Sequence, residues 1–206
     1  ILTSERAELS DPRVRALAMV AAAGAATYEA YLVVRRAGVT FDGLADLRGA
    51  RICYVDRRST SGFVVPRSML RRRGLDPERL FAEQRFSGNH YQALRDLLAG
   101  RCDVAAVYSG AFLSAAAEGI QVGRARILAV SGRLPDDVIC AGPGLSPRLA
   151  RQVRKALLEL DVQREFGRRT LGAAVPITHF VPVRAADFRE LEREAAAAGA
   201  SRRPAP

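Results

Sequence analysis

Short apolar segments alternate along this chain with segments in which apolar residues recur every three or four positions. The first kind is typical of buried strands and covers residues 28–36, 50–56, 80–88, 102–110 and 125–132, with a further apolar run at 138–142. The second kind is typical of amphipathic helices and covers residues 41–49, 63–74, 89–100, 111–119, 146–160 and 185–199. Strands that alternate with crossover helices predict an α/β fold with a largely parallel sheet.

The helix predicted at 63–74 is preceded by a cluster of hydroxyl side chains. Ser59, Thr60 and Ser61 stand together, and Gly62 follows them. One hydroxyl is enough to cap a helix, so an ordinary cap is one interpretation of the cluster. Three hydroxyls, free backbone amides and the positive end of a helix dipole also form a cradle for an oxyanion. Both interpretations stay open from these residues alone.

This cluster lies where an α/β sheet binds its ligands, beyond the carboxyl end of a strand. It follows the strand predicted at 50–56. Gly88, Asn89 and His90 occupy the same place after the strand predicted at 80–88, and Asn89 is a suitable cap for the next helix. The two turns are therefore candidates for ligand contacts.

Composition narrows the classes of function. The chain of 206 residues has room for one domain or two small lobes, and its net charge of +10 comes almost entirely from arginine. The basic residues are scattered and aromatic residues do not alternate with them, which argues against a nucleic-acid surface. A positive field still attracts small anions. With two histidines and no CxxC pair, we expect no bound metal and no cofactor.

The cysteines and the start of the chain carry further expectations. Cys53, Cys102 and Cys140 lie inside apolar, strand-like segments, which favours buried free thiols. The apolar runs are too short to span a membrane. Residues 1–20 lack the basic, apolar and small-residue order of a signal peptide, so we expect a processed chain or a part of a longer one.

Four stretches resemble one family in their order along the chain: STSGFVVPRSMLRRRGLDPE, FSGNHYQALRDLLAGRCDVAAV, LPDDVICAGPGLSPRLARQVRKALLEL and FVPVRAADFRELE. From about residue 17 to about residue 195 the chain is similar to the phosphate, phosphite and phosphonate substrate-binding proteins of ABC transporters. The resemblance implies a bilobal, type II periplasmic-binding fold with parallel-rich sheets and flanking helices. It also implies a remnant of lobe 1 and a hinge strand at 1–33, lobe 2 at 34–138, and a return to lobe 1 with C-terminal helices at 139–206.

The same resemblance implies a function and a set of ligand contacts. The implied contact residues are Ser59, Thr60, Ser61, Gly62, His90, Asp137 and Tyr28. Together they would hold a small phosphorus oxyanion in a cleft between the lobes, with Tyr28 lining the cleft. Asp137 would accept from a protonated P–OH or pair with a substrate amine. If His90 donates as an imidazolium, its contribution is largest at low pH. The protein would act in the periplasm, with an ABC permease as its partner.

The chain departs from the family pattern in three ways. Arg57 and Arg58 stand where the family commonly has a proline before the hydroxyl cluster, which adds positive charge at the mouth of the site. Residues 108–110 read Tyr-Ser-Gly where amine-binding members offer an acid, which argues against an aminophosphonate. The first strand–helix–strand–helix portion of the family is not in this chain, so we expect one lobe to be incomplete.

Two other functions stay open. Serine, histidine and aspartate are all present, but no GxSxG elbow surrounds any serine, which argues against an enzyme. A ligand-sensing domain of the same fold, attached to a signalling protein such as a kinase, is the stronger alternative to transport.

Overall fold

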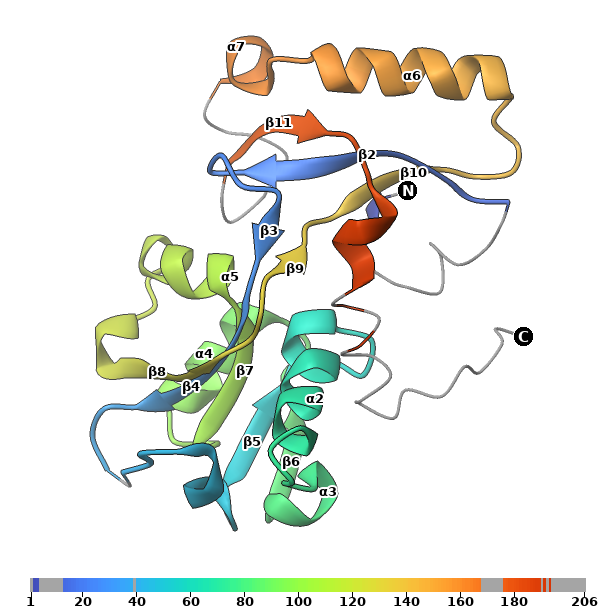
Figure 1. Cartoon of the computed structure of the whole chain (residues 1–206). Coiled ribbons are helices and arrows are strands. Elements are labelled where there is room, and N and C mark those ends of the chain that lie inside the picture. The colour runs from blue at the N-terminus through green and yellow to red at the C-terminus, as the bar shows by residue number, and fades with distance from the viewer. Residues whose placement is uncertain are drawn as a thin grey trace. The chain divides into compact units, whose positions relative to one another are not determined.

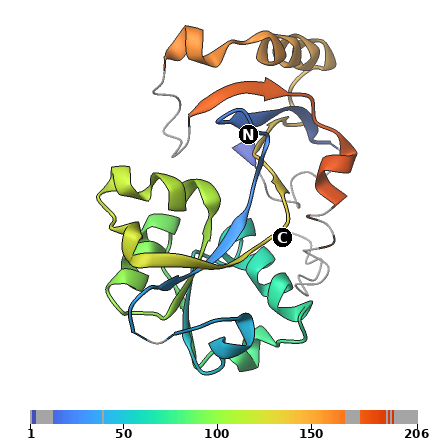
Figure 2. The ribbon, with the colours of Figure 1, turned by 60° about the vertical axis from the view of Figure 1, so that its left-hand side comes forward.

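The computed structural model describes residues 2–3, 13–38, 40–167, 176–189, 191 and 193. The chain divides into two compact units. Unit 1 consists of Ile1–Tyr28 and Arg133–Arg189, and unit 2 consists of Glu29–Gly132 and Glu190–Pro206. Figure 1 and Figure 2 show a sheet with helices packed against it in each unit. None of the helices in the described part of the chain has the length and apolar character needed to cross a membrane.

Unit 2 contains a five-stranded sheet with the strand order β6-β5-β7-β4-β8. The strands are β4 (Ala30–Arg35), β5 (Arg51–Tyr54), β6 (Glu83–Phe86), β7 (Val104–Tyr108) and β8 (Ala125–Val130). β5 pairs in parallel with β6 and β7, whereas β4 pairs antiparallel with β7 and β8. The expected parallel pairing therefore holds only for β5, β6 and β7. The chain enters this unit through β4 and leaves it through the neighbouring strand β8. The two strands therefore run in opposite directions.

Helical segments cover both faces of this sheet. They are η1 (Leu44–Leu47), η2 (Thr60–Val64), α2 (Val65–Arg71), α3 (Pro77–Leu80), α4 (His90–Leu98), α5 (Ser109–Ser114), η3 (Ala115–Glu118) and η4 (Val122–Arg124). Side chains alternate between the two faces of a strand. Leu32 of β4 accordingly packs in one core with Leu70 of α2, and its neighbour Val33 packs in another core with Leu94 of α4.

The helices predicted in this region are present with shorter bounds. Residues 41–49 contain only the 3-10 segment η1, and the helix expected from residue 63 begins earlier, with a wide turn at Thr60. The sequence predicts a strand from residue 80, but Leu80 is the last residue of α3 and the strand β6 begins at Glu83. Asp76 caps α3 and Pro77 occupies its first turn, which is the usual local signal for a helix start.

Unit 1 contains a four-stranded antiparallel sheet with the order β1-β10-β2-β11. Its elements are β1 (Leu2–Thr3), β2 (Arg15–Ala22), β3 (Thr27–Tyr28), β9 (Leu134–Pro135), β10 (Val138–Ala141), α6 (Pro147–Glu159), α7 (Val162–Phe166), β11 (Ile177–Val181) and η5 (Ala185–Phe188). α6 and α7 pack against this sheet through Ala150 and Val162. β3 and β9 form a separate two-stranded ladder in which Tyr28 faces Leu134.

Three features of unit 1 bear on the sequence predictions. The helix predicted at 146–160 is present as α6, with Ser146 as its cap and Pro147 in its first turn. The central strand β2 was not identified from the sequence, because its Ala, Leu and Met residues favour helices over strands. Of the helix predicted at 185–199, the structure describes η5 and residues 189, 191 and 193, and the rest lies outside the described residues.

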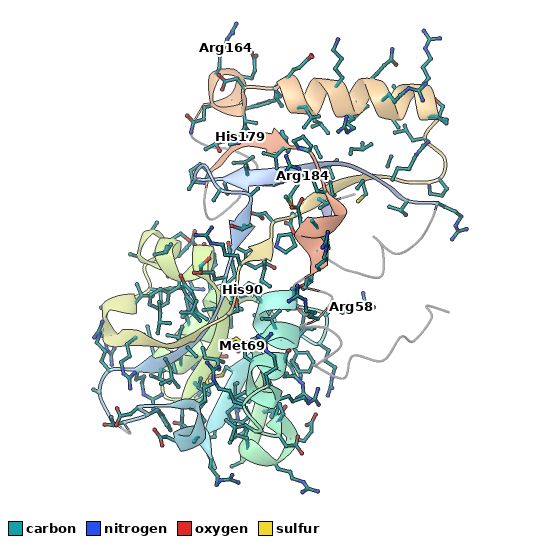
Figure 3. The ribbon with its side chains drawn as sticks, viewed as in Figure 1. Arg58, Met69, His90, Arg164, His179 and Arg184 are labelled. Carbon is teal, nitrogen blue, oxygen red and sulfur yellow. A yellow bond between two sulfur atoms is a disulfide. The ribbon has the colours of Figure 1, made fainter. Side chains whose placement is uncertain are left out.

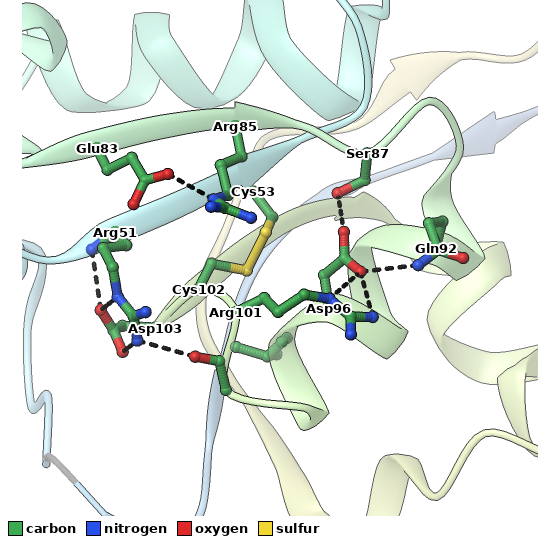
Figure 4. The surroundings of a disulfide bond; sticks show 12 residues. Arg51, Cys53, Glu83, Arg85, Ser87, Gln92, Asp96, Arg101, Cys102 and Asp103 are labelled. Atoms are coloured by element: carbon green, nitrogen blue, oxygen red, sulfur yellow. Dashed lines mark hydrogen bonds and ion pairs between the residues drawn. A yellow bond between two sulfur atoms is a disulfide. The ribbon is translucent and has the colours of Figure 1, made fainter.

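Cys53 and Cys102 form a disulfide bond, so the expectation of free thiols at these positions is wrong. The S–S distance is 2.17 Å and the two Cα atoms are 5.8 Å apart. Figure 4 shows the bond between β5 and the segment that leads into β7. These segments are adjacent only through the parallel β5–β7 pairing, which brings together residues separated by 49 positions. Cys140, in unit 1, is a buried thiol as expected.

A charged cluster beside the disulfide joins the same two segments where β5 and β7 begin. The Arg51 guanidinium donates to both carboxylate oxygens of Asp103, at 3.0 and 2.9 Å (Figure 4). Arg35 donates to the same carboxylate at 3.2 Å. The hydrogen bonds from Arg51 lower the pKa of Asp103 to about 2, against an ordinary value of 3.8. The Asp103 side chain is only 15% exposed, so solvent weakens these bonds little.

We expect Asp103→Asn to destabilise the protein at pH 7 by about 1–2 kcal/mol, because a lowered carboxyl pKa stabilises the folded state at any pH above the ordinary value. This contribution is lost as the pH falls from about 4 toward 2. Urea unfolding of the natural and variant proteins at pH 7 and pH 2.5 measures the difference. A difference that stays the same at both pH values contradicts the assignment of the low pKa to Asp103.

Candidate functional site

Two turns meet at the edge of unit 2 where the parallel strands β5 and β6 end. The amide of Ser87 donates to the carbonyl of Tyr54 at 2.8 Å, and the amide of Gly88 donates to the carbonyl of Val55 at 2.9 Å. These bonds join the turn after β6 to the turn after β5. The structure therefore brings together the two turns that the sequence placed after separate strands.

The turn after β5, residues 56–62, is called the hydroxyl turn below. Asp56 Oδ1 accepts the amides of Arg58 and Ser59 at 2.7 and 3.0 Å, and Ser59 Oγ accepts the amide of Gly62 at 3.0 Å. Ser59 is therefore the helix cap. The hydroxyls and amides of Thr60 and Ser61 donate no hydrogen bond to another described residue. The cap and the donors without a described partner thus belong to different residues of one turn.

Gly62 allows the close packing that shapes this turn. A Cβ atom at this position would lie 2.5 Å from Val55 Cγ2 and 2.7 Å from Ser59 Oγ. Both distances are shorter than any normal contact, so a larger residue would displace the turn or break the cap. Glycine is needed at position 62 because Val55 and Ser59 approach the backbone closely there. This close approach explains why a glycine follows the hydroxyl cluster.

His90 is the first residue of α4, behind the cap Asn89, whose Oδ1 accepts the Gln92 amide at 2.8 Å. His90 Nδ1 accepts the backbone amide of Tyr108 at 3.3 Å, which places the imidazole proton on Nε2. Burial lowers the pKa of His90 to about 4, although the Asp56 carboxylate opposes this shift. Burial disfavours the charged ring, so His90 is neutral near pH 7 and carries its N–H at Nε2.

Figure 3 shows His90 and Arg58 at the end of unit 2 where β5 and β7 finish. Arg57 and Arg58 are both exposed there. Both belong to the hydroxyl turn and give it two positive charges that face solvent. Among the described residues, no group of three or more His, Cys, Asp or Glu side chains is arranged to hold a metal ion.

The same edge includes residues that the sequence analysis did not identify. The amide of Glu29 donates to Ser109 Oγ at 3.2 Å, and the amide of Ser109 donates to the Glu29 carbonyl at 2.8 Å. Glu29 Oε2 accepts the hydroxyl of Tyr31 at 3.1 Å, and burial raises the pKa of Tyr31, with the Glu29 carboxylate adding to the shift. No sequence signal could have found the Tyr108 amide that orients His90, because its role depends on the backbone of a neighbouring strand.

Tyr28 and Asp137, the other two predicted contacts, belong to unit 1. The carbonyl of Asp137 accepts the amide of Val20 at 2.8 Å, and its amide donates to Asp136 Oδ1 at 2.9 Å. Burial raises the pKa of Asp136, and the Asp137 carboxylate adds to this shift. The places of Tyr28 and Asp137 in a ligand site stay predictions.

The fold and this edge can now be compared with known proteins. Residues 6–188 match the family described as ABC transporter, phosphonate, periplasmic substrate-binding protein. The chain belongs to this family. The predicted family, the type II fold and the general function of substrate binding for ABC transport are therefore confirmed. This is a solute-binding family and not a family of enzymes.

Several solved structures share the fold at low sequence identity. PhnD1 from Prochlorococcus marinus, in complex with methylphosphonate, is 16% identical with a TM-score of 0.73, over 92% of this chain and 72% of that chain. XAC2383 from Xanthomonas citri, bound to ATP, is 20% identical with a TM-score of 0.72, over 91% of this chain and 71% of that chain. A histidine kinase sensor domain with similarity to periplasmic binding proteins is 22% identical with a TM-score of 0.50, over 79% of this chain and 65% of that chain.

Proposed function

We propose that the hydroxyl turn and His90 bind one small phosphorus oxyanion, a phosphonate, phosphite or phosphate. The observation that carries the proposal is the set of donors at this edge of unit 2. Thr60 and Ser61 offer hydroxyls and amides that donate to no other described residue, and His90 offers Nε2–H at the same edge of the sheet. Tyr28 and Asp137 of unit 1 complete the proposed contacts.

Neutral donors suit the reversible capture of an anion. Each hydrogen bond to an ionised oxygen is worth about 1.5–3 kcal/mol, and several together give tight binding without a buried cation. The net charge of +10 and the exposed Arg57 and Arg58 draw anions toward this edge. The Asp137 carboxylate, which accepts but does not donate when ionised, favours a ligand that still carries a P–OH proton or an amine.

We further propose that the protein works in the periplasm and delivers its ligand to an ABC permease. The family supports both statements, and the Cys53–Cys102 disulfide is independent support for an oxidising compartment. The likeness to a kinase sensor domain keeps sensing as the second candidate. Ligand uptake by cells is expected to fail when the gene is deleted if the protein serves transport, and to continue if it serves only sensing.

Ligand-induced stabilisation tests the proposal directly. At a ligand concentration one hundred times the dissociation constant, we expect about 2.7 kcal/mol of added stability, or a rise of roughly 5–10 °C in melting temperature. The panel is methylphosphonate, phosphite and phosphate, with sulfate as the matched anion that carries no proton near neutral pH. The absence of a shift with all three phosphorus oxyanions would contradict the proposal, and an equal shift with sulfate would contradict the role of Asp137.

A further inference from the structure

An arginine lies over an exposed aromatic ring beside the hydroxyl turn. The guanidinium carbon of Arg57 is 5.0 Å from the ring centroid of Phe86, which is the last residue of β6. Phe86 is 41% exposed, and Arg57 is also exposed. These two residues are called the Arg57–Phe86 platform below.

Two further aromatic rings hold Phe86 in place from the protein interior. Its ring centroid is 5.6 Å from that of Phe63 in η2 and 6.1 Å from that of Tyr54 in β5. Tyr54 is fully buried and is also the register partner of Phe86 in the β5–β6 ladder. The exposed ring therefore rests on a fixed aromatic base, with little conformational entropy left to lose when a ligand contacts it.

The platform adjoins both elements of the proposed site along the chain. Arg57 is itself part of the hydroxyl turn, two positions before Ser59. Phe86 is followed by Ser87 and Gly88, whose amides bond to the end of β5, and then by the α4 start that carries His90. Both platform residues thus lie at the carboxyl edge of the sheet, next to the donors for the oxyanion.

The Arg57 guanidinium has no ion-pair partner among the described residues. The nearest acid in sequence, Asp56, uses Oδ1 to accept two amides of the turn. A guanidinium that lies over one ring is still able to stack against a second planar group. A single exposed phenylalanine needs no explanation. Phe86 together with the Arg57 guanidinium, which has no ion-pair partner among the described residues, forms a two-residue surface for a ligand.

We propose that the Arg57–Phe86 platform binds the organic substituent of the phosphorus oxyanion, and that this substituent is an aromatic or other planar unsaturated group. The inference rests on the proposed function, because the hydroxyl turn must hold the oxyanion for its substituent to reach the platform. A planar group gains contact with the guanidinium face and the phenylalanine edge. Inorganic phosphate has no such group, and a methyl substituent is too short to cover either surface.

Phenylphosphonate and methylphosphonate test this inference, because they share the head group and differ in the substituent. We expect the full chain to bind phenylphosphonate roughly five- to tenfold more tightly in calorimetric titrations. Phe86→Ala is expected to remove most of this preference while methylphosphonate affinity stays within about twofold. Arg57→Ala is expected to remove most of the preference as well, with an added loss of anion attraction that both ligands share. Leu113→Ala, at a 73% exposed apolar residue of α5, is the matched control and should leave the preference unchanged.

Three results would overturn the inference and leave the proposed function standing. One is methylphosphonate binding with no preference for the phenyl compound. Another is a preference that survives Phe86→Ala. The third is an equal loss for both ligands in Arg57→Ala and Arg58→Ala, which would show that Arg57 only attracts anions. Failure of both ligands to bind the unchanged protein would reject the proposed function together with the inference.

Discussion

Replacing Thr60 and Ser61 together by alanine is expected to weaken oxyanion binding at least about a hundredfold while the protein stays folded. Each lost hydroxyl removes a hydrogen bond to a charged oxygen worth about 1.5–3 kcal/mol, and about 1.4 kcal/mol corresponds to a factor of ten in affinity. The fold should survive because neither hydroxyl donates to another described residue, and the cap is made by Ser59. Calorimetric titration with methylphosphonate and far-ultraviolet circular dichroism measure the two effects.

Two single variants separate binding from folding in this experiment. Thr60→Ser keeps a hydroxyl at the same place and should bind within a few-fold of the natural protein. Ser59→Ala removes the cap, so we expect it to lower the free energy of unfolding by about 1 kcal/mol. If the double variant unfolds, or if its affinity loss matches its loss of stability, the cluster acts only as a helix cap and the proposed site is wrong.

Removing the Cys53–Cys102 disulfide is expected to lower the free energy of unfolding by about 2–4 kcal/mol. The bond restricts the unfolded chain by joining residues separated by 49 positions, and it fixes β5 to the segment before β7 beneath the proposed site. Urea unfolding of the Cys53→Ala, Cys102→Ala double variant measures the loss. Ligand affinity should fall much less than stability, because neither cysteine belongs to the hydroxyl turn.

The loss of two buried sulfur atoms also costs packing energy, and Cys140→Ala controls for it. Cys140 is a buried thiol in unit 1, so its truncation reports the cost of lost packing without a broken cross-link. The natural protein should also unfold at lower urea concentration under reducing conditions, whereas the double variant should not respond. Equal stability of the natural protein with and without reductant would show that the bond contributes nothing.

Features that depend on neighbouring residues were predictable from the sequence. Ser146 with Pro147 and Asn89 mark the starts of α6 and α4 because capping is a contact between residues three positions apart. The order of helices and strands placed the hydroxyl turn and His90 after two separate strands, and the family resemblance gave the fold. The sequence shows that Gly62 follows the hydroxyl cluster. The reason that a glycine is needed there, the close approach of Val55, is seen only in the structure.

Only the tertiary structure decided the features that join distant segments. Cys53 and Cys102 were expected to be thiols, because nothing in either segment shows that β5 and β7 are neighbours. The antiparallel directions of β4 and β8 follow from where the chain enters and leaves unit 2, which the local pattern does not encode. His90 is a neutral donor because burial and the Tyr108 amide fix its protonation, and both are set by residues far away in the sequence. Local patterns determine which groups stand at the end of a strand, whereas their charge, partners and neighbours depend on long-range packing.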